Sequence, residues 1–260
     1  MRKFGILTTN RAINYGAVLQ CYALSKKIDS FENVECEVVD YAPPKKTYGR
    51  TISYKFKSIK DIAYSTILFL NKKYRSGHIQ KIKGFDNFIT NILKQSKKTY
   101  IDINDFGEEL KDYEALVCGS DQIWNLNIID DPVFFLQFDK VPNNPKKVAY
   151  APSITEPMSD EQVEKIKDRT KDFSALSMRE RESAELFTKH IGKEVKNVLD
   201  PVFLLNEEEW LKIAVKPKNV EKPFILSYGL VSDPLFKDCV SSLKSKYKGV
   251  KHVDLQVRPF

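Results

Sequence analysis

FGILTTNRAINYGAVLQCYALSKKIDSFENVECEVVDY, residues 4–41, decides the fold class. The apolar run at residues 4–8 predicts a strand, and an apolar pattern close to the 3.6-residue period, opened by Gly16, predicts a helix after it. A second apolar run at residues 36–39 predicts another strand, which ends at Asp40. Strand, helix and strand in this order are typical of a parallel sheet, so we expect a Rossmann-like α/β fold.

The same alternation continues along the chain. Further strands and helices are expected at residues 85–93, 115–118, 147–151, 159–173, 175–178, 182–190 and 195–199. The charged segment 206–222, which contains Pro217, predicts a linker between an N-terminal α/β domain (residues 1–205) and a second α/β domain (residues 223–260). One strand–helix–strand unit cannot cover both faces of its sheet, so we expect the second domain to be incomplete in this chain.

The composition excludes several classes of protein. A net charge of +7 favours acidic partners such as phosphates, anionic glycans or a membrane surface. The lysines are spread along the chain without a basic tail, so no nucleic-acid partner is expected. The four cysteines form no CxxC pair and lie far from the histidines, so no metal site is expected, and reduced cysteines suit the cytoplasm.

The most apolar run of the chain is residues 62–70, with Lys60 before it and Lys72 after it. It is far shorter than the roughly 20 residues that cross a bilayer. We expect a helix buried in the core, while the flanking positive charges also suit a segment at a membrane surface or a lid. Residues 47–60 show no clear period and predict a long excursion from the core.

Small and polar residues follow the expected strands. In an open α/β sheet, ligands bind at the carboxyl ends of the strands. The residues expected to meet in one crevice there are Thr8, Thr9, Asn10, Asn14, Tyr15, Gly16, Gly119, Ser120, Asp121, Gln122, Pro152, Ser153, Arg179, Glu180 and Asp200. The chain contains no G-x-G-x-x-G and no G-x-x-x-x-G-K-[ST] motif, so neither a nicotinamide cofactor nor a nucleoside triphosphate is expected.

The stretch GSDQIW, which begins at Gly119, carries the most informative chemistry. Gly119 permits close approach of the backbone to a ligand, and Ser120 and Gln122 offer hydrogen bonds to hydroxyls. Asp121 could act as a general base, and Trp124 could stack on a sugar ring. The same pattern suits an ordinary helix N-cap with Trp124 in the core, so both interpretations stay open.

Arg179 follows the strand expected at residues 175–178. A guanidinium there suits a carboxylate or a phosphate. An ion pair with Glu180 or Glu182 at a solvated helix start explains it equally well. The three histidines stand in lysine-rich or terminal stretches, so we expect no catalytic role for His78, His190 and His252.

Six segments, in sequence order, resemble the polysaccharide pyruvyl transferase family. They are NYGAVLQCYAL (14–24), FDNF (85–88), LVCGSDQIWN (116–125), KVAYAPS (147–153), LSMRE (176–180) and VLDPVFLL (198–205), with Trp210 following. The resemblance implies a bacterial transferase that moves pyruvate from phosphoenolpyruvate onto two hydroxyls of a cell-surface glycan, forming a ketal. It also implies exopolysaccharide biosynthesis, a GT-B-like two-domain fold and a glycan or lipid-linked oligosaccharide as acceptor, with no metal or organic cofactor.

For individual residues, the resemblance implies proton transfer or acceptor orientation by Asp121 and binding of the donor's carboxylate or phosphate by Arg179. The residues it places along the cleft are Asn14, Tyr15, Gln20, Ser120, Gln122 and Ser153. Members of the family carry a Ser-Phe-His-Gly-like motif in the second domain, and no histidine of this chain matches it. We therefore expect part of the donor site to lie outside these 260 residues, which leaves open whether this chain is active alone.

Two other functions fit the same residues. One is a GT-B-like glycosyltransferase that uses a nucleotide sugar, and the other is an inactive, glycan-binding remnant. In each case we expect a cytoplasmic protein, in part at the inner face of the membrane, because the amino terminus lacks the apolar core of a signal peptide.

Overall fold

The computed structural model describes residues 1–43, 59–139, 141–217, 220–229 and 233–256. They belong to two compact units, Met1–Leu211 and Lys212–Phe260. The boundary between the units falls within the charged segment 206–222.

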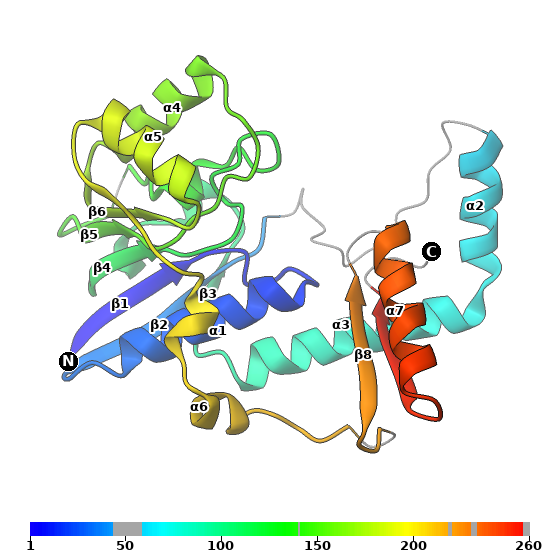
Figure 1. Ribbon diagram of the computed structural model, residues 1–260. Coiled ribbons are helices and arrows are strands. Elements are labelled where there is room, and N and C mark those ends of the chain that lie inside the picture. Colours follow the sequence, from blue (N-terminus) through cyan, green and yellow to red (C-terminus); the bar gives the residue numbers. More distant parts are fainter. Residues whose placement is uncertain (44–58, 140, 218–219, 230–232, 257–260) are drawn as a thin grey trace. The chain divides into compact units, whose positions relative to one another are not determined.

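Seven parallel strands form the central sheet of the first unit, in the order β3-β2-β1-β4-β5-β6-β7 (Figure 1). They are β1 (Arg2–Leu7), β2 (Val34–Tyr41), β3 (Gln95–Tyr100), β4 (Tyr113–Cys118), β5 (Lys146–Ala149), β6 (Phe173–Met178) and β7 (Val195–Asn197). The predicted Rossmann-like α/β fold is confirmed. The order of strands reverses between β1 and β4, and such a switch point is where open α/β sheets bind ligands.

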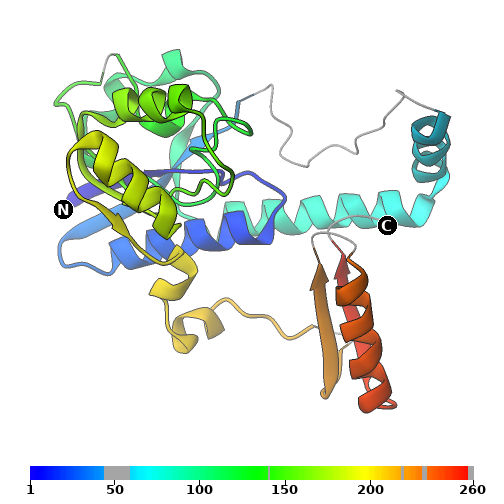
Figure 2. The ribbon, with the colours of Figure 1, turned by 45° about the horizontal axis from the view of Figure 1, so that its top comes forward.

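Helices cover both faces of this sheet (Figures 1 and 2). The described helices of the first unit are α1 (Tyr15–Asp29), α2 (Ile59–Leu70), α3 (Lys72–Asn91), α4 (Asp160–Thr170), α5 (Arg181–Ile191) and α6 (Glu207–Leu211). Its described 3-10 helices are η1 (Ile103–Asp105), η2 (Glu108–Leu110), η3 (Pro132–Phe135) and η4 (Pro201–Leu204). Helices α1 and α3 lie along one face, and α4 and α5 lie over the other. The central strands therefore have helices on both sides, as a parallel sheet requires.

Local sequence explains where two of these helices begin. The side chain of Asn14 accepts a hydrogen bond from the Ala17 N–H and caps α1. Ser159 and Gln162 form a reciprocal capping box at the start of α4. Both caps satisfy backbone N–H groups that a helix leaves without an internal partner.

The apolar run at residues 62–70 forms the predicted helix, α2, but the prediction that it is buried is wrong. Ile62, Ile67, Phe69 and Leu70 are 47%, 58%, 56% and 70% exposed. Helix α2 packs against α3, and Ser65 is one of its buried residues. Among the described residues, no helix combines the length and apolar character needed to cross a bilayer. Most of the predicted excursion, residues 47–58, lies outside the described residues.

The second unit contains β8 (Phe224–Gly229), α7 (Pro234–Lys246) and β9 (Lys251–Gln256), with β8 and β9 paired in parallel. This is the strand–helix–strand unit that the sequence predicts. Within it, the Ser227 hydroxyl donates to Asp254 Oδ1 at 2.7 Å and lies 2.9 Å from His252 Nε2.

Candidate active site

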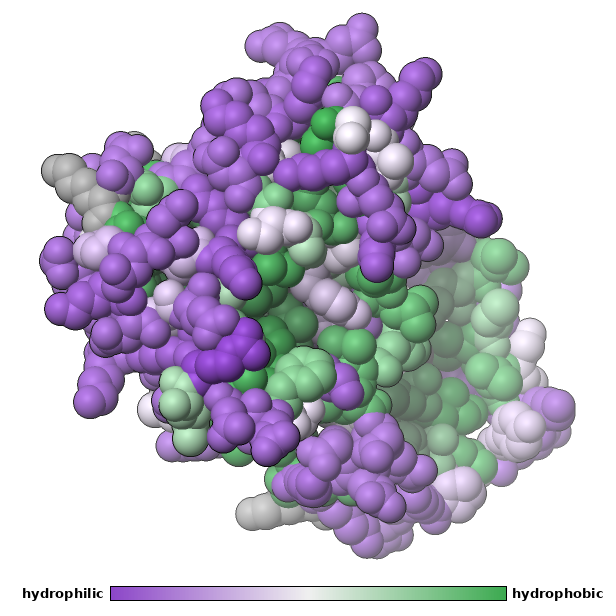
Figure 3. All heavy atoms as spheres, turned by 90° about the vertical axis from the view of Figure 1, so that its left-hand side faces the viewer, coloured by the Kyte–Doolittle hydropathy of each residue, from purple (hydrophilic) through white to green (hydrophobic). Residues whose placement is uncertain are grey.

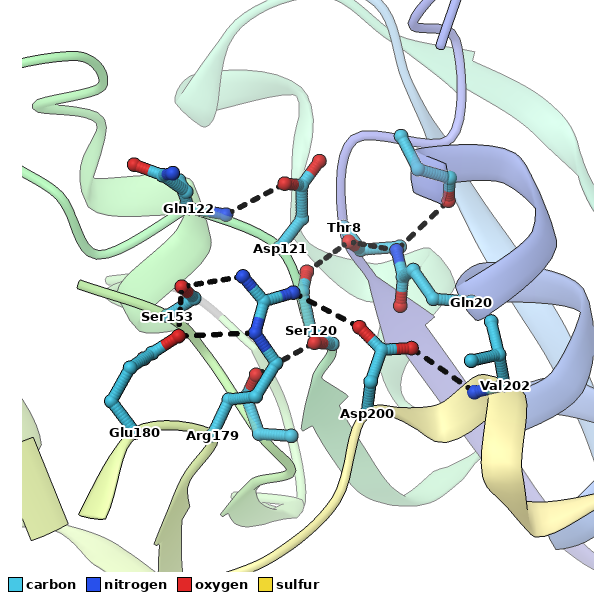
Figure 4. A network of polar contacts seen from close by, with 12 residues as sticks. Thr8, Gln20, Ser120, Asp121, Gln122, Ser153, Arg179, Glu180, Asp200 and Val202 are labelled. Carbon is cyan, nitrogen blue, oxygen red and sulfur yellow. Dashed lines mark hydrogen bonds and ion pairs between the residues drawn. The ribbon is translucent and has the colours of Figure 1, made fainter. Parts of the chain in front are cut away.

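The loops that follow β1 and β4 are tied together at the switch point of the sheet (Figure 4). The Thr8 hydroxyl, just after β1, donates to the Ser120 carbonyl at 2.8 Å. The Thr9 hydroxyl donates to Asp121 Oδ2 at 2.6 Å. These two bonds fix the GSDQIW loop beside the end of the first strand, where the sequence predicts a crevice.

Asp121 is held in a left-handed backbone conformation, with φ of 84°. Its carbonyl accepts the Ser153 N–H at 2.9 Å, and its Oδ1 accepts the Gln122 N–H at 2.8 Å. Aspartate tolerates this conformation better than most residues, yet the surrounding bonds must still hold it there. The result is a half-buried carboxylate with a fixed direction, which can hold or accept a proton.

Each of the three guanidinium nitrogens of Arg179 donates a hydrogen bond to a neighbouring side chain (Figure 4). Its Nε lies 3.1 Å from Glu180 Oε1, its Nη1 2.9 Å from Asp200 Oδ2 and its Nη2 2.7 Å from Ser153 Oγ. The predicted ion pair with Glu180 is confirmed, while Asp200 is a partner of Arg179 that sequence reasoning missed. Three of the five guanidinium N–H donors have partners among the described residues, which leaves two that a ligand can use.

The electrostatics around Arg179 are negative overall. Burial alone would lower the pKa of Arg179, but hydrogen bonds to Glu180 and Asp200 raise it above its ordinary value. The guanidinium therefore stays charged, between two carboxylates that outnumber it. A ligand anion must bind through the two remaining donors or displace one of these carboxylates.

Ser153 joins the two predicted catalytic residues. Its N–H donates to the Asp121 carbonyl, and its hydroxyl accepts from Arg179 Nη2 and donates to Glu180 Oε1 at 2.7 Å. Ser153 is fully buried, so it supports these loops and does not line the surface. The loops after β4, β5 and β6 thus form one connected assembly.

Two further predicted cleft residues, Gln20 and Ser120, are buried as well. The Gln20 amide donates to Thr8 Oγ1 at 3.0 Å, and the Ser120 hydroxyl donates to the Ala151 carbonyl at 2.7 Å. The prediction that Gln20, Ser120 and Ser153 line the crevice surface is therefore wrong for their side chains. Their hydrogen bonds are used inside the protein, where they hold the loops in place.

Trp124 lies in the core, so the interpretation that it stacks on a sugar is wrong. The side chain is 1% exposed, and its ring stacks on Phe135 with centroids 5.2 Å apart. The edge of Phe173 lies 5.9 Å away, and the indole N–H donates to the Phe134 carbonyl at 3.0 Å. Both the apolar ring and its polar N–H are satisfied internally, as is usual for a core tryptophan.

The predicted residues at the start of α1 are exposed at the same edge of the sheet, since α1 follows β1. They are Asn14, Tyr15 and Gly16. The Tyr15 ring is 40% exposed and packs against Phe85, with centroids 5.0 Å apart. At Gly16, an added Cβ would meet only the Asn14 side chain, at 3.3 Å, so the backbone there is open to approach by a ligand. Gln122 is half-buried, and its Oε1 accepts from the Asn125 amide at 2.9 Å.

A second charged cluster lies at the end of β2, around Asp40, which is 3% exposed. Arg11 makes a forked pair with it at 2.6 and 2.5 Å, and the Thr99 hydroxyl donates at 2.6 Å. Burial opposes ionisation, but the bonds from Arg11, Thr99 and Asn10 outweigh it and hold the pKa of Asp40 below its usual value. Because this carboxylate is saturated by protein donors, its role is to hold β2 to the loop after β1.

Cysteine chemistry has no place at this site. Burial raises the pKa of Cys21, Cys36 and Cys118, that of Cys36 to about 12. These thiols stay protonated at neutral pH and are weak nucleophiles. Among the residues that the structure describes, no group of three or more His, Cys, Asp or Glu could hold a metal ion.

Comparison with known proteins identifies one family. The family model described as polysaccharide pyruvyl transferase matches residues 14–249, a range that includes both Asp121 and Arg179. No curated protein and no solved structure matches the chain.

Proposed function

The chain belongs to the polysaccharide pyruvyl transferase family, and from this premise we propose that it transfers pyruvate from phosphoenolpyruvate to two hydroxyls of a sugar. The product is a cyclic ketal on a cell-surface glycan, and the second product is inorganic phosphate. The acceptor is a glycan or a lipid-linked oligosaccharide, and the reaction takes place in the cytoplasm, where reduced cysteines are expected.

The proposed reaction makes four demands on the site. The methylene carbon of phosphoenolpyruvate takes up a proton and becomes a methyl group, which leaves a cationic centre at its neighbour. One sugar hydroxyl attacks that centre and loses its proton. The bond to the phosphate oxygen breaks, and the second hydroxyl attacks the same carbon and releases a proton to the departing phosphate. Proton transfer and charge stabilisation are thus the whole chemistry, and neither requires a metal or an organic cofactor.

Asp121 is suited to the proton transfer. Its carboxylate is oriented by the Thr9 hydroxyl and by the Gln122 N–H, and it remains half-exposed at the switch point. In the proposal it accepts the proton of the attacking hydroxyl or orients that hydroxyl toward the donor. A fixed carboxylate at the carboxyl ends of parallel strands is well placed for either role.

Arg179 is suited to hold the anionic donor. Two of its N–H donors have no partner among the described residues, and the other three keep the guanidinium plane fixed. A planar cation of fixed direction matches a carboxylate or a phosphate with two parallel hydrogen bonds. Asn14, Tyr15, Gly16 and Gln122 are the exposed or half-exposed residues that we propose for the acceptor side, while the GT-B-like architecture stays a prediction.

The observation that carries this proposal is the link through Ser153, which connects the loop of Asp121 to the side chain of Arg179. The test is transfer of labelled pyruvate from phosphoenolpyruvate to an oligosaccharide, with ketal formation followed by NMR and phosphate release followed in parallel. Binding of UDP- or GDP-sugar without binding of phosphoenolpyruvate would instead indicate a glycosyltransferase. Acceptor binding with no turnover would indicate a glycan-binding remnant.

A further inference from the structure

The hairpin of α2 and α3, two helices joined at Asn71, exposes apolar side chains on α2. Ile62, Phe69 and Leu70 are spaced i, i+7 and i+8 and therefore share one side of α2, where each is about half-exposed or more. Ser65, a polar residue of the same helix, is 2% exposed. Three apolar side chains of α2 are thus exposed, which a helix packed on a soluble core would bury.

The same hairpin is strongly basic. Residues 59–84 contain six basic residues and one acidic residue, Asp61, so this short segment carries +5 of the chain's net +7. The basic residues are Lys60, Lys72, Lys73, Arg75, Lys81 and Lys83. The preceding sequence, residues 44–58, adds five basic residues and no acid.

Charge and apolar surface meet within the hairpin. The guanidinium of Arg75, near the start of α3, lies over the Phe69 ring at 5.2 Å from its centroid. Lys72 and Lys83 are exposed on α3. A positive charge held at the border of an apolar helix face is typical of a segment that binds the boundary between lipid headgroups and acyl chains.

Exposed apolar surface by itself does not single out this hairpin. Figure 3 shows another face of the protein, where apolar residues gather toward the middle of a hydrophilic surface. Near the end of the first unit, Leu199, Phe203 and Leu211 are also exposed. That region contains the acidic run Glu207, Glu208 and Glu209, which an anionic surface would repel. Positive charge therefore separates the α2–α3 hairpin from this acidic region.

We propose that the α2–α3 hairpin binds the surface of an anionic lipid bilayer. The apolar side of α2 enters the headgroup boundary and lies parallel to the membrane, and the lysines and Arg75 pair with lipid phosphates. Basic residues near an anionic membrane each add to the attraction, so several of them and a short apolar face give reversible binding. The end of the hairpin near Lys81 lies beside Tyr15, while the apolar side chains of α2 lie at its other end, and the proposal does not depend on the pyruvyl transfer reaction.

The test is flotation of the full chain with vesicles of phosphatidylglycerol and phosphatidylcholine in equal parts, compared with vesicles of phosphatidylcholine alone. We expect the chain to bind the anionic vesicles at least about tenfold more tightly than the neutral ones. Binding to the anionic vesicles should be lost near 1 M salt, where charges are screened. Equal binding to both kinds of vesicle, or no binding to either, would overturn the proposal.

Two variants separate the contributions of charge and apolar surface. Lys72→Glu with Lys83→Glu, at two exposed positions of α3, should weaken binding by more than about tenfold, since two attractive charges become repulsive. Phe69→Ser with Leu70→Ser should also weaken binding to the anionic vesicles.

The matched control is Lys189→Glu with Lys196→Glu, which changes the net charge equally at exposed positions elsewhere and should bind like the original chain. Circular dichroism checks that each variant is folded. Loss of a dimer in Phe69→Ser with Leu70→Ser, without vesicle binding by the original chain, would mark the face as a protein interface and refute the lipid proposal.

Discussion

The Nη1 atom of Arg179 lies 2.9 Å from Oδ2 of Asp200, which is 21 residues further along the chain. The other carboxylate oxygen of Asp200 accepts the Val202 N–H at 3.0 Å and caps η4. One side chain thus anchors the candidate donor-binding cation and the turn that follows β7. Since η4 packs against α1, this carboxylate connects the Arg179 loop to the helix that begins beside the switch point.

Replacement of Arg179 by lysine tests the proposed donor contact. Arg179→Lys keeps the charge but loses the planar fork, so we expect kcat/KM for phosphoenolpyruvate to fall on the order of 100-fold. The matched control is Arg181→Lys, because Arg181 is exposed on α5 and pairs only with Glu185 among the described residues. Phosphate release measures both variants. Activity of Arg179→Lys equal to that of Arg181→Lys would remove Arg179 from the donor site.

Asp200→Asn removes a charge while keeping an oxygen that can cap η4. With one of its two carboxylate anchors lost, Arg179 should be less well oriented, and we expect the KM for phosphoenolpyruvate to rise by about tenfold with little change in kcat. Asp200→Glu should restore part of the affinity. If kcat falls and KM stays unchanged, Asp200 acts in the chemical step and not by positioning Arg179.

Asp121→Asn and Asp121→Ala separate the chemistry of Asp121 from its backbone conformation. Asparagine accepts a φ of 84° readily, whereas alanine in this region costs about 1–2 kcal/mol. We expect both variants to lose turnover by a factor of about 10² to 10⁴. Urea unfolding should show that only Asp121→Ala is clearly less stable. Turnover of Asp121→Asn within tenfold of the original chain would contradict a role in proton transfer.

The sequence predicts most of the fold because its apolar runs are regular. Strand β3 was missed because its residues, QSKKTY, are mostly polar and β3 is an edge strand with little buried surface. For α2, the sequence predicts a helix but cannot tell an apolar run that faces the core from one that faces outward. That distinction depends on where α3 carries the hairpin, which is a long-range property of the chain.

For the site, the strand-end rule places Asp121 and Arg179 at one edge of the sheet, and the structure joins their loops through Ser153. It cannot tell which polar residues point outward, since Ser120, Gln20 and Ser153 use their hydrogen bonds inside the protein. The Asp200 contact joins residues of two separate loops, and no local pattern encodes it. The one signal that the sequence offers is the position of the Asp200 carboxylate shortly after the end of β7.

Acid should weaken the first unit partly through Asp40. The pKa of Asp40 is lowered in the folded chain, so its stabilising effect is full above the unfolded value of about 3.9 and is lost as the pH falls through the folded value. We expect Asp40→Asn to reduce the free energy of unfolding at pH 7 by roughly 2–4 kcal/mol. The free energy of unfolding should also fall less steeply with decreasing pH in this variant than in the original chain. Urea unfolding between pH 3 and 7 measures this. Asp168→Asn, at an exposed ion pair with Lys171, is the control and should change stability by less than about 0.5 kcal/mol. If the free energy of unfolding of Asp40→Asn falls with decreasing pH as steeply as that of the original chain, other groups cause the acid sensitivity.

Two glycines should respond to alanine with opposite signs. At Gly5, in the central strand β1, an added Cβ would lie 2.8 Å from Tyr113 Cε1, 2.9 Å from Val39 Cγ2 and 3.0 Å from Leu116 Cδ2. Such overpacking forces neighbouring side chains to move and costs about 1–3 kcal/mol. At Gly84, inside α3, nothing lies within 4 Å of the added atom, and alanine favours the helix by roughly 0.5–1 kcal/mol. Thermal unfolding should therefore show a lower Tm for Gly5→Ala and a higher one for Gly84→Ala. Equal shifts of the same sign would mean that β1 is not packed as closely against β2 and β4 as the strand register implies.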